Sequence, residues 1–353
     1  MKNNILITGS LGLIGSACVE HFASINIDNN IFGIDNDMRS FFFGKEGSTL
    51  KNRNLLKKKF TNYNHLNLDI RNKNKIDSFF KVHKPKAIIH CAAQPSHDLA
   101  SKIPFEDFTV NANATLNLLE ATRAFVPKSS FIFLSTNKVY GDNPNYLNLI
   151  EKKTRWDFQD KKYQSGIDES FSIDQTKHSL FGCSKLAADI LVQEYGKYYG
   201  MNTVCLRGGC LTGSNHSGVE LHGFLSYLVK CYVTGVRYNV YGYKAKQVRD
   251  NISSYDVANF IDLFIQSPRQ GEVYNIGGGK KNSISILEVI NYLESKYKKK
   301  MNWDYVDKNR IGDHICYYTN LNKIKKHYPD WKIENNIEDI IDLIYYAWKN
   351  FEK

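Results

Sequence analysis

The sequence lacks most of the features that mark membrane, secreted or disulfide-rich proteins. No apolar run approaches the roughly 18 residues that a membrane-spanning helix needs. The first four residues lead directly into a short apolar segment at 5–9, without the pattern of a signal peptide. The seven cysteines are odd in number and form no Cys-x-x-Cys pair, which favours reduced thiols over disulfides or a zinc site. We therefore expect a soluble cytoplasmic protein with no bound metal and no membrane association.

The composition is that of an ordinary globular protein. Its 353 residues include 42% hydrophobic and 24% charged residues, which argues against disorder, and the length suggests two domains. The formal net charge is +11, a sign that suits an anionic ligand. Because the lysines are scattered and not gathered on one predicted face, we expect no nucleic-acid partner.

Short apolar runs alternate with amphipathic stretches in the first half of the chain. Strands are predicted at 5–8, 31–34, 65–68, 87–90, 131–135 and 203–206. Helices between them, such as 115–125 and 181–199, indicate an α/β fold with a Rossmann-type doubly wound parallel sheet. Two long irregular segments, 36–63 and 142–178, are expected to be ordered loops.

The pattern changes after Gly208, where shorter strands and helices alternate with glycine-rich turns. These features predict a second, smaller mixed α/β domain. We expect the Rossmann-type domain to comprise 1–207 plus about 248–268, and the second domain to comprise 208–247 and 269–353.

A glycine-rich sequence follows the first predicted strand and opens a helix. Such a turn lets backbone N–H groups approach a pyrophosphate, and the helix N-terminus faces its negative charge. The expected cofactor-binding residues of this turn are Gly9, Leu11, Gly12, Leu13, Ile14 and Gly15. Asp35 ends the second strand about 20 residues later, where a carboxylate accepts from ribose hydroxyls and favours NAD over NADP. Asn36 and Arg39 lie beside it, and the positive charge of Arg39 weakens that preference.

Further segments carry a resemblance to a known family. They are the glycine turn and residues 68–71, 90–94, 111–115, 135–141, 182–185, 247–250 and 275–278. Over nearly its whole length, the chain resembles the extended short-chain dehydrogenase/reductase family, and within it the nucleotide-sugar epimerases. The stretch Thr-Asn-Lys-Val-Tyr-Gly-Asp at 136–142, Gly-Cys-Ser-Lys at 182–185 and the long insert before Lys185 are most similar to those of CDP-tyvelose (CDP-paratose) 2-epimerases.

The resemblance implies roles for individual residues. Cofactor contacts would come from Asp69, Ile70, Ala92, Ala93, Gln94, Asn111 and Lys185. Among these, Asp69 and Ile70 would border the adenine, and Lys185 would hold the nicotinamide ribose beside the reacting hydroxyl. Thr136 would hydrogen-bond the hydroxyl that is oxidised. Substrate contacts would come from Asn137, Arg249 and Arg310, and the two arginines suit a diphosphate because guanidinium groups pair bidentately with phosphate oxygens.

One position departs from the family pattern. Phe181 stands four residues before Lys185, where the family has its catalytic tyrosine, and phenylalanine has no proton acceptor. Three explanations fit this departure: an engineered trap, a protein that has lost catalysis, and an enzyme with its base elsewhere; we favour the last. His97 is the first candidate for that base, because an imidazole with a pKa near 6.5 suits proton transfer. Tyr140, whose usual role is packing, and His178, which could equally be a residue at the helix entry, are alternatives.

A second departure argues against a dehydratase. The family's 4,6-dehydratases carry two acids directly after the catalytic threonine, and here Asn137 and Lys138 occupy those positions. The expected activity is NAD-dependent epimerisation of a nucleotide sugar, at C2 of a CDP-hexose, in polysaccharide biosynthesis. A nucleotide-sugar oxidoreductase and a catalytically impaired NAD- or nucleotide-sugar-binding protein are the alternatives. By the same resemblance, a homodimer would form through helices 115–125 and 181–199.

Overall fold

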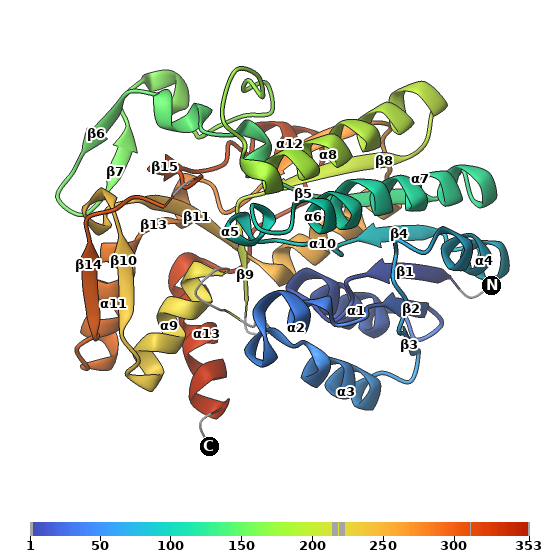
Figure 1. Cartoon of the computed structure of the whole chain (residues 1–353), viewed down its shortest axis with the longest axis horizontal. Helices are drawn as coiled ribbons and strands as arrows, with labels where there is room; N and C mark the ends of the chain where they lie inside the picture. Colours follow the sequence, from blue (N-terminus) through green and yellow to red (C-terminus); the bar gives the residue numbers. More distant parts are fainter. Residues whose placement is uncertain (1–2, 214–217, 219–222, 311, 352–353) are drawn as a thin grey trace. The chain divides into compact units, whose positions relative to one another are not determined.

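The computed structural model describes residues 3–213, 218, 223–310 and 312–351, and the chain divides into two compact units (Figure 1). Residues 1–139, 180–207 and 254–274 make up the first unit. Residues 140–179, 208–253 and 275–353 make up the second. Among the described residues, no helix combines the length and the apolar character needed to cross a membrane.

The first unit is built on a seven-stranded sheet with the order β12-β8-β5-β4-β1-β2-β3. The strands from β5 to β3 pair in parallel, with Ile7 of β1 opposite both Gly33 of β2 and Ile89 of β4. The strands are β1 (Asn4–Thr8), β2 (Asn30–Ile34), β3 (Tyr63–Leu66), β4 (Ala87–His90), β5 (Ser130–Thr136), β8 (Thr203–Gly208) and β12 (Glu272–Ile276). This sheet confirms the predicted Rossmann-type doubly wound fold.

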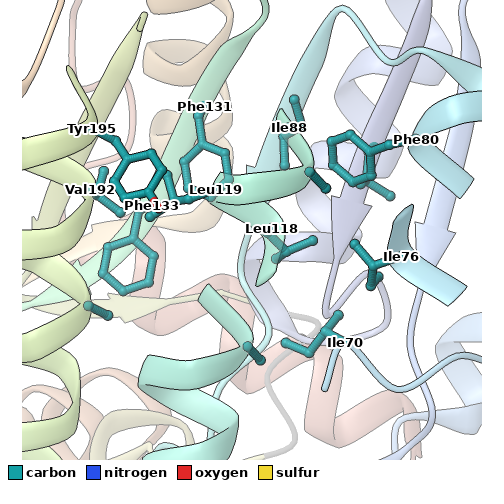
Figure 2. Packing of buried hydrophobic residues seen from close by; sticks show 14 of the residues in the cluster. Ile70, Ile76, Phe80, Ile88, Leu118, Leu119, Phe131, Phe133, Val192 and Tyr195 are labelled. Carbon is teal, nitrogen blue, oxygen red and sulfur yellow. The ribbon is translucent and has the colours of Figure 1, made fainter. Parts of the chain in front are cut away.

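Helices cover both faces of this sheet. They are α1 (Leu13–Ile25), α2 (Met38–Phe43), α3 (Leu50–Lys59), α4 (Lys73–His83), α5 (His97–Ala100), α6 (Pro104–Phe108), α7 (Ala114–Phe125), α8 (Ser179–Tyr199) and α10 (Ser254–Gln266). Figure 2 shows the core on one face, where α4, α7 and α8 pack Phe80, Leu118 and Val192 against Ile88 and Phe133 of the strands. Alternate residues of the strands point to the other face, and they are buried as well, which explains why these strands are apolar without interruption.

The second unit combines short strands with helices. β11 (Val248–Ser253) pairs with β13 (Ser283–Ser285), β15 (Cys316–Tyr317) and β9 (Cys210–Thr212). Two further pairs are β10 (Tyr238–Tyr241) with β14 (Trp303–Val306), and β6 (Leu149–Glu151) with β7 (Trp156–Phe158). The helices are α9 (Phe224–Thr234), α11 (Ile286–Tyr297), α12 (Asn322–His327) and α13 (Ile337–Phe351). The apolar faces of α9, α11 and α13 share one core with β10, centred on Leu228, Val240, Ile290 and Ile341.

The structure differs from the predicted boundaries at residues 140–179 and 248–253, which belong to the second unit. The prediction had placed both segments in the first domain, and it had placed residues 269–274, which belong to the first unit, in the second domain. The β6–β7 hairpin instead bonds within the second unit: Trp156 Nε1 donates to Tyr243 O (3.2 Å), and Tyr318 OH donates to Asp157 Oδ1 (2.9 Å). β11 finds its strand partners in the second unit, and α10 returns the chain to the first.

The two segments expected to be irregular contain regular elements. α2 and α3 occupy much of 36–63, and the β6–β7 hairpin lies within 142–178. All seven cysteines are free thiols. Within the described residues, no group of three or more histidine, cysteine or acidic side chains is placed to hold a metal ion.

Candidate active site

The glycine turn between β1 and α1 has no room for side chains. Gly9 has a φ of +66°, and a Cβ there would come within 2.7 Å of Ala92 N. A Cβ on Gly15 would lie 2.0 Å from Gly9 O, so α1 packs directly against the turn. Gly12 precedes α1 and supplies no capping side chain to the helix start. The first N–H groups of α1 are therefore suited to the oxygens of a pyrophosphate.

Asp35 lies beside this turn at the end of β2. Its Oδ2 accepts from Leu11 N (3.0 Å) and its Oδ1 from Asp37 N (2.9 Å), which leaves each oxygen a lone pair for a ribose hydroxyl. Burial raises the pKa of Asp35. Arg39 packs over the ring of Phe43 at 4.9 Å, and burial lowers its pKa to about 10 while the nearby Asp35 and Asp37 counteract that effect. The glycine turn and the carboxylate of Asp35 fit the adenosine diphosphate part of NAD. Asn36 is exposed next to them.

The residues expected at the adenine have partners of their own. Burial raises the pKa of Asp69, but hydrogen bonds from Arg71 outweigh it and hold that pKa below its ordinary value. Arg71 NH2 lies 2.6 Å from Asp69 Oδ2, and Arg71 NH1 lies 2.5 Å from Glu106 Oε1. Ile70 is buried in the core below.

Gln94 and Asn111 form a buried lattice of hydrogen bonds. Asn111 Oδ1 accepts from Gln94 N (2.9 Å), and Gln94 Nε2 donates to Asp107 Oδ1 (2.7 Å). Asn111 Nδ2 lies 3.0 Å from Ser184 Oγ on α8, one residue before Lys185. Asn111 itself sits in a π-helical turn, Thr109–Asn113, of the kind often found at functional sites. Both side chains make their hydrogen bonds within the protein. They hold the loop that follows β4 against α8.

A buried histidine supports the same loop from below. Thr115 Oγ1 donates to Asn111 O (2.7 Å), so it accepts from His90 Nε2 (2.9 Å), which fixes the tautomer. His90 Nδ1 then accepts from Thr8 Oγ1 (2.7 Å), and Thr8 Oγ1 accepts from Ala92 N (3.3 Å). Burial lowers the pKa of His90 to about 3, so this network is neutral at pH 7. It positions Ala92 and the neighbouring Ala93 beside the glycine turn.

Thr136 and Lys185 are held at the carboxyl end of β5. Thr136 ends the strand and its Oγ1 accepts from Lys138 N (3.2 Å). Lys185 extends from α8, donates from Nζ to Leu134 O (2.7 Å) and lies 4.1 Å above the ring of Phe133. The Lys185 side chain is nearly inaccessible, and burial lowers its pKa to about 8 although Asp189 opposes this shift. Asn137 follows Thr136 and is buried.

Asp189, which sequence reasoning missed, ties three elements together under these residues. It lies on α8 one turn after Lys185, and the spacing of four residues was the available signal. Ser135 of β5 donates to Asp189 Oδ2 (2.5 Å), and Arg207 of β8 lies 2.9 Å from Asp189 Oδ1. The ion pair is almost fully buried, with side-chain exposures of 5% and 0%.

Phe181 and His97 are in contact. Their ring centroids are 4.9 Å apart and the planes meet at 69°, an edge-to-face arrangement. Phe181 is buried, whereas His97 is partly exposed at the start of α5. Tyr140 is fully buried in the second unit and its hydroxyl donates to Asn275 Oδ1 (2.7 Å), which gives it a packing role. His178 also belongs to the second unit.

Arg249 is a buried cation in the second unit. Its side chain is 10% exposed, NH1 donates to Val248 O (2.8 Å), and NH2 lies 3.4 Å from Asp313 Oδ1. Asp313 follows closely after Arg310, and its N donates to Arg310 O (3.4 Å). Both Arg310 and Asp313 act electrostatically on Tyr238, whose pKa is raised mainly by burial. The two predicted diphosphate-binding arginines therefore lie in the same part of the second unit.

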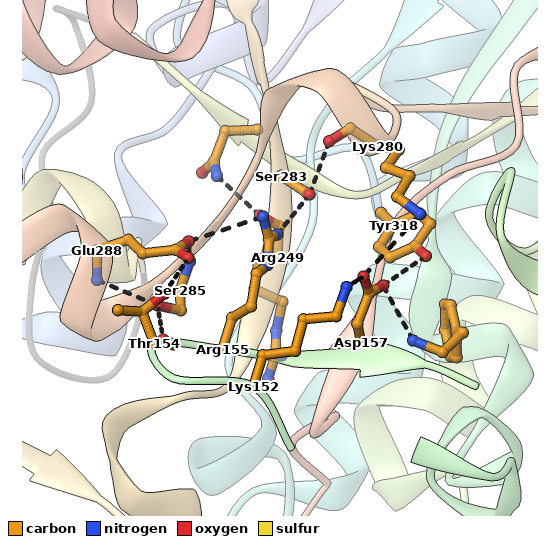
Figure 3. A network of polar contacts seen from close by, with 12 residues as sticks. Lys152, Thr154, Arg155, Asp157, Arg249, Lys280, Ser283, Ser285, Glu288 and Tyr318 are labelled. Carbon is orange, nitrogen blue, oxygen red and sulfur yellow. Dashed lines mark hydrogen bonds and ion pairs between the residues drawn. The ribbon is translucent and has the colours of Figure 1, made fainter. Parts of the chain in front are cut away.

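The β6–β7 hairpin is fastened next to the strand that carries Arg249. Arg249 lies opposite Ile284 in the pairing of β11 with β13. Figure 3 shows the hairpin contacts on either side of that position: Arg155 NH2 donates to Ser283 Oγ (2.6 Å), and Ser285 Oγ donates to Thr154 O (2.7 Å). These contacts, which sequence reasoning missed, join residues more than 120 positions apart and have no local pattern.

The sequence matches a family model and several known proteins over most of its length. Residues 5–277 match the model of the NAD dependent epimerase/dehydratase family. The chain is 32% identical over 348 residues to a CDP-paratose 2-epimerase of Salmonella typhi, covering 97% of this chain and 98% of that protein. It is 28% identical over 298 residues to a dTDP-glucose 4,6-dehydratase of Escherichia coli, covering 81% of this chain and 75% of that protein.

A solved structure shows the same fold. The UDP-glucuronic acid 4-epimerase of Bacillus cereus, crystallised with UDP-glucuronic acid and NAD, superposes with a TM-score of 0.79 at 24% identity, covering 99% of each chain. The family match and the relative above 30% identity confirm the resemblance inferred from the motifs. The chain belongs to the NAD-dependent epimerase/dehydratase family of nucleotide-sugar enzymes, whose cofactor is NAD.

Proposed function

We propose that this chain is an epimerase that inverts C2 of a CDP-linked hexose. The observation that carries the proposal is the placement of Thr136 and Lys185 together at the end of β5, in the unit that holds the glycine turn. Similarity to a CDP-paratose 2-epimerase over nearly both whole chains supports the sugar and the nucleobase. The amide and ammonium of Asn137 and Lys138 cannot exchange protons as a dehydratase's acid pair does, which disfavours loss of water.

NAD bound at the turn and Asp35 would supply a reversible hydride acceptor. The chain's own residues perform the rest. Thr136 hydrogen-bonds the sugar hydroxyl, and the ammonium of Lys185 stabilises negative charge on that oxygen as its proton leaves. The C2–H bond breaks as the C2=O bond forms, and the reverse step delivers the same hydride to the opposite face. Arg249 and Arg310 supply the positive charge that pairs with the diphosphate.

The hydroxyl proton needs an acceptor, and Phe181 offers none. We assign this role to His97, because its ring contacts Phe181 where the family's tyrosine would stand. General-base help of this kind is commonly worth about 10²–10⁴-fold in rate. The change of His97 to Gln should lower kcat by a factor in that range.

Substitution at the neighbouring position tests this assignment. With a relocated base, Phe181→Tyr should leave the activity unchanged or lower it, and in the His97→Gln background it should restore part of the lost activity. A large gain from Phe181→Tyr alone would instead indicate a protein whose catalysis was lost or trapped. His83, on the separate helix α4, gives the control variant His83→Gln, which should retain full activity.

The function itself is tested with CDP-paratose deuterated at C2. We expect the inverted sugar to form with deuterium retained at C2, because the hydride leaves and returns within one bound state. Net formation of NADH without an epimer would select the one-way oxidoreductase. Binding of NAD and nucleotide sugar without any turnover would select a non-catalytic binding protein, the alternative that Phe181 motivates.

We also propose that the chain forms a homodimer through the helices of the first unit. Three large apolar side chains on these helices are exposed: Phe105 on α6 by 87%, Leu116 on α7 by 38% and Ile190 on α8 by 45%. A second copy would bury them in a four-helix bundle. The expected cytoplasmic location and the expected lack of a nucleic-acid partner stay predictions.

A further inference from the structure

Asp107 is a buried carboxylate on α6 that bonds to the loop following β4 and to α8. The residue is 1% exposed, and its Oδ1 accepts from Gln94 Nε2 (2.7 Å) and from Asn111 Nδ2 (3.0 Å). Burial raises the pKa of Asp107, and hydrogen bonds from Ser184 and Gln94 oppose this shift. Because a carboxylate only accepts hydrogen bonds, it fixes the orientation of both amides, whose NH2 groups must face it.

The amide of Gln94 carries this constraint to the start of α5. Its Oε1 accepts from Ser96 N (2.6 Å) and its Nε2 donates to Ser96 O (2.9 Å), so it binds both polar groups of the Ser96 backbone. Ser96 is the N-cap of α5, and its side chain accepts from Leu99 N (3.3 Å). Since His97 is the next residue, Asp107 helps to place the imidazole to which the role of base is assigned above.

The amide of Asn111 carries the constraint to α8. Asn111 Nδ2 lies 3.0 Å from Ser184 Oγ, and Ser184 Oγ lies 3.1 Å from Phe181 O. These contacts hold the helical turn that leads to Lys185, and its Phe181 contacts His97. One carboxylate therefore supports the segments of both residues that handle the reacting hydroxyl.

Asp107 also acts on the charge of Lys185. Burial lowers the pKa of Lys185 to about 8. The groups that oppose this shift come from α8, the end of β4, β8 and α6, and they are Asp189, Cys91, Cys205 and Asp107. His90 of β4 also faces Lys185, but burial lowers its pKa to about 3 and leaves it neutral. Asp189 forms an ion pair with Arg207, whereas the amides that bond to Asp107 are neutral and leave its charge uncompensated.

We propose that Asp107 is a positioning residue of the active site: its carboxylate holds the segments that carry His97 and Lys185, and its charge favours the ammonium form of Lys185. The inference rests on the proposed function, in which these two residues handle the proton and the negative charge of the reacting hydroxyl. Asp107 acts on the reaction through them, by way of its charge and of the amides of Gln94 and Asn111.

The change of Asp107 to Asn removes the charge and keeps an oxygen for both amides. We expect the pKa of Lys185 to fall by about one unit, the lower end of the effect of a nearby opposite charge. In the full chain saturated with NAD, kcat for CDP-paratose should then change less than about twofold at about pH 6 and fall about eightfold at about pH 8.5. A purely structural role would lower kcat by the same factor at both pH values. Glu194→Gln, which removes a carboxylate from an exposed position on α8, should keep the unsubstituted profile.

A second measurement needs no substrate. Denaturant titrations across the pH range report the ionisation of Lys185 in the folded chain, because Lys185→Met removes that contribution. The free energies of unfolding of the unsubstituted chain and of Lys185→Met should differ in slope from about pH 8 upward. In the Asp107→Asn background, the same difference should begin about one pH unit lower.

The hydrogen bonds are tested separately by Asp107→Leu, which has a similar shape but no acceptor. Both amides then lose an acceptor, so kcat at about pH 6 should fall at least about tenfold below that of Asp107→Asn, with KM changed less than about twofold. If Asp107→Leu does not fold, the smaller Asp107→Ala serves for the same comparison. Equal kcat values for the Leu or Ala variant and the Asn variant would mean that these hydrogen bonds do not position the reacting groups.

The outcomes separate the two proposals. If the slope difference begins at the same pH with and without Asp107→Asn, Asp107 does not support the ammonium and the inference is wrong. An equal loss of kcat at both pH values would contradict it as well. If the onset shifts but the unsubstituted chain turns over no CDP-hexose, the proposed function fails, while the charge of Asp107 still acts on Lys185.

Discussion

Lys185 combines burial with positive charge, and this makes its ionisation sensitive to pH. Burial lowers its pKa to about 8, against an ordinary value near 10.5. The ammonium that stabilises the sugar oxygen is present below this pH and lost above it. We therefore predict that kcat falls as the pH rises through about 8. Lys185→Met should abolish activity at every pH, whereas Lys197→Met, on the exposed end of the same helix, should keep the unsubstituted profile.

The same ionisation has the opposite effect on stability. Below about pH 8 Lys185 is protonated in both the folded and the unfolded chain. Burying its ammonium then destabilises the folded chain to the full extent. Between about pH 8 and 10.5 the folded chain loses the proton first, and this group's contribution to the free energy of unfolding rises. Denaturant titrations of the unsubstituted chain and Lys185→Met should differ in slope over that range. Parallel pH dependences would contradict the lowered pKa.

Among the elements, β5, α8 and β8 are joined by a single carboxylate, Asp189. Its change to Ala would remove the buried carboxylate that pairs with Arg207, a loss that typically costs about 3–5 kcal/mol. We predict a loss of this size in the free energy of unfolding by urea. Removing both charges in an Asp189→Leu, Arg207→Met variant should recover most of it. Glu20→Gln, which breaks an exposed pair with Lys59, serves as the control and should cost less than about 1 kcal/mol.

The turn between β10 and β11 contains backbone strain. Tyr243, Lys244 and Ala245 have φ values of 51°, 58° and 60°, the left-handed region that costs a residue with a side chain about 1–2 kcal/mol. Contacts from the β6–β7 hairpin hold this turn, including both lysine bonds to Glu151, from Lys244 and Lys246. Ala245→Gly should therefore raise the free energy of unfolding by about 1 kcal/mol.

The same replacement elsewhere should have the opposite sign. Ala124 is exposed in the helix α7, where glycine costs about 1 kcal/mol relative to alanine. A thermal melt that shows Ala124→Gly and Ala245→Gly both destabilising would contradict the strain at the turn.

At the scale of the whole molecule, the sequence predicted those features that depend on residues close together in the chain. The apolar strands and the glycine turn were recognisable because both are short, contiguous segments. The hairpin's place in the second unit was not, since Trp156 and Asp157 bond to residues 87 and 161 positions away. Asp189 was missed although it lies one helical turn after Lys185, because its partner Arg207 is brought near only by the folded chain. The contact of His97 with Phe181 likewise joins distant parts of the chain, and no sequence pattern predicted it.

The proposed dimer is a property of the whole molecule and has a direct test. Placing a charge at Ile190 of α8, by Ile190→Glu, would bury an unpaired carboxylate in the helical bundle and should raise the dimer dissociation constant at least about a hundredfold. Sedimentation velocity at micromolar concentration should then show a monomer. A thermal melt should show an unchanged melting temperature. Val82→Glu is the matched control, because Val82 is 73% exposed on α4, outside the proposed interface. If the unsubstituted chain sediments as a monomer, the proposed dimer through α6, α7 and α8 is wrong.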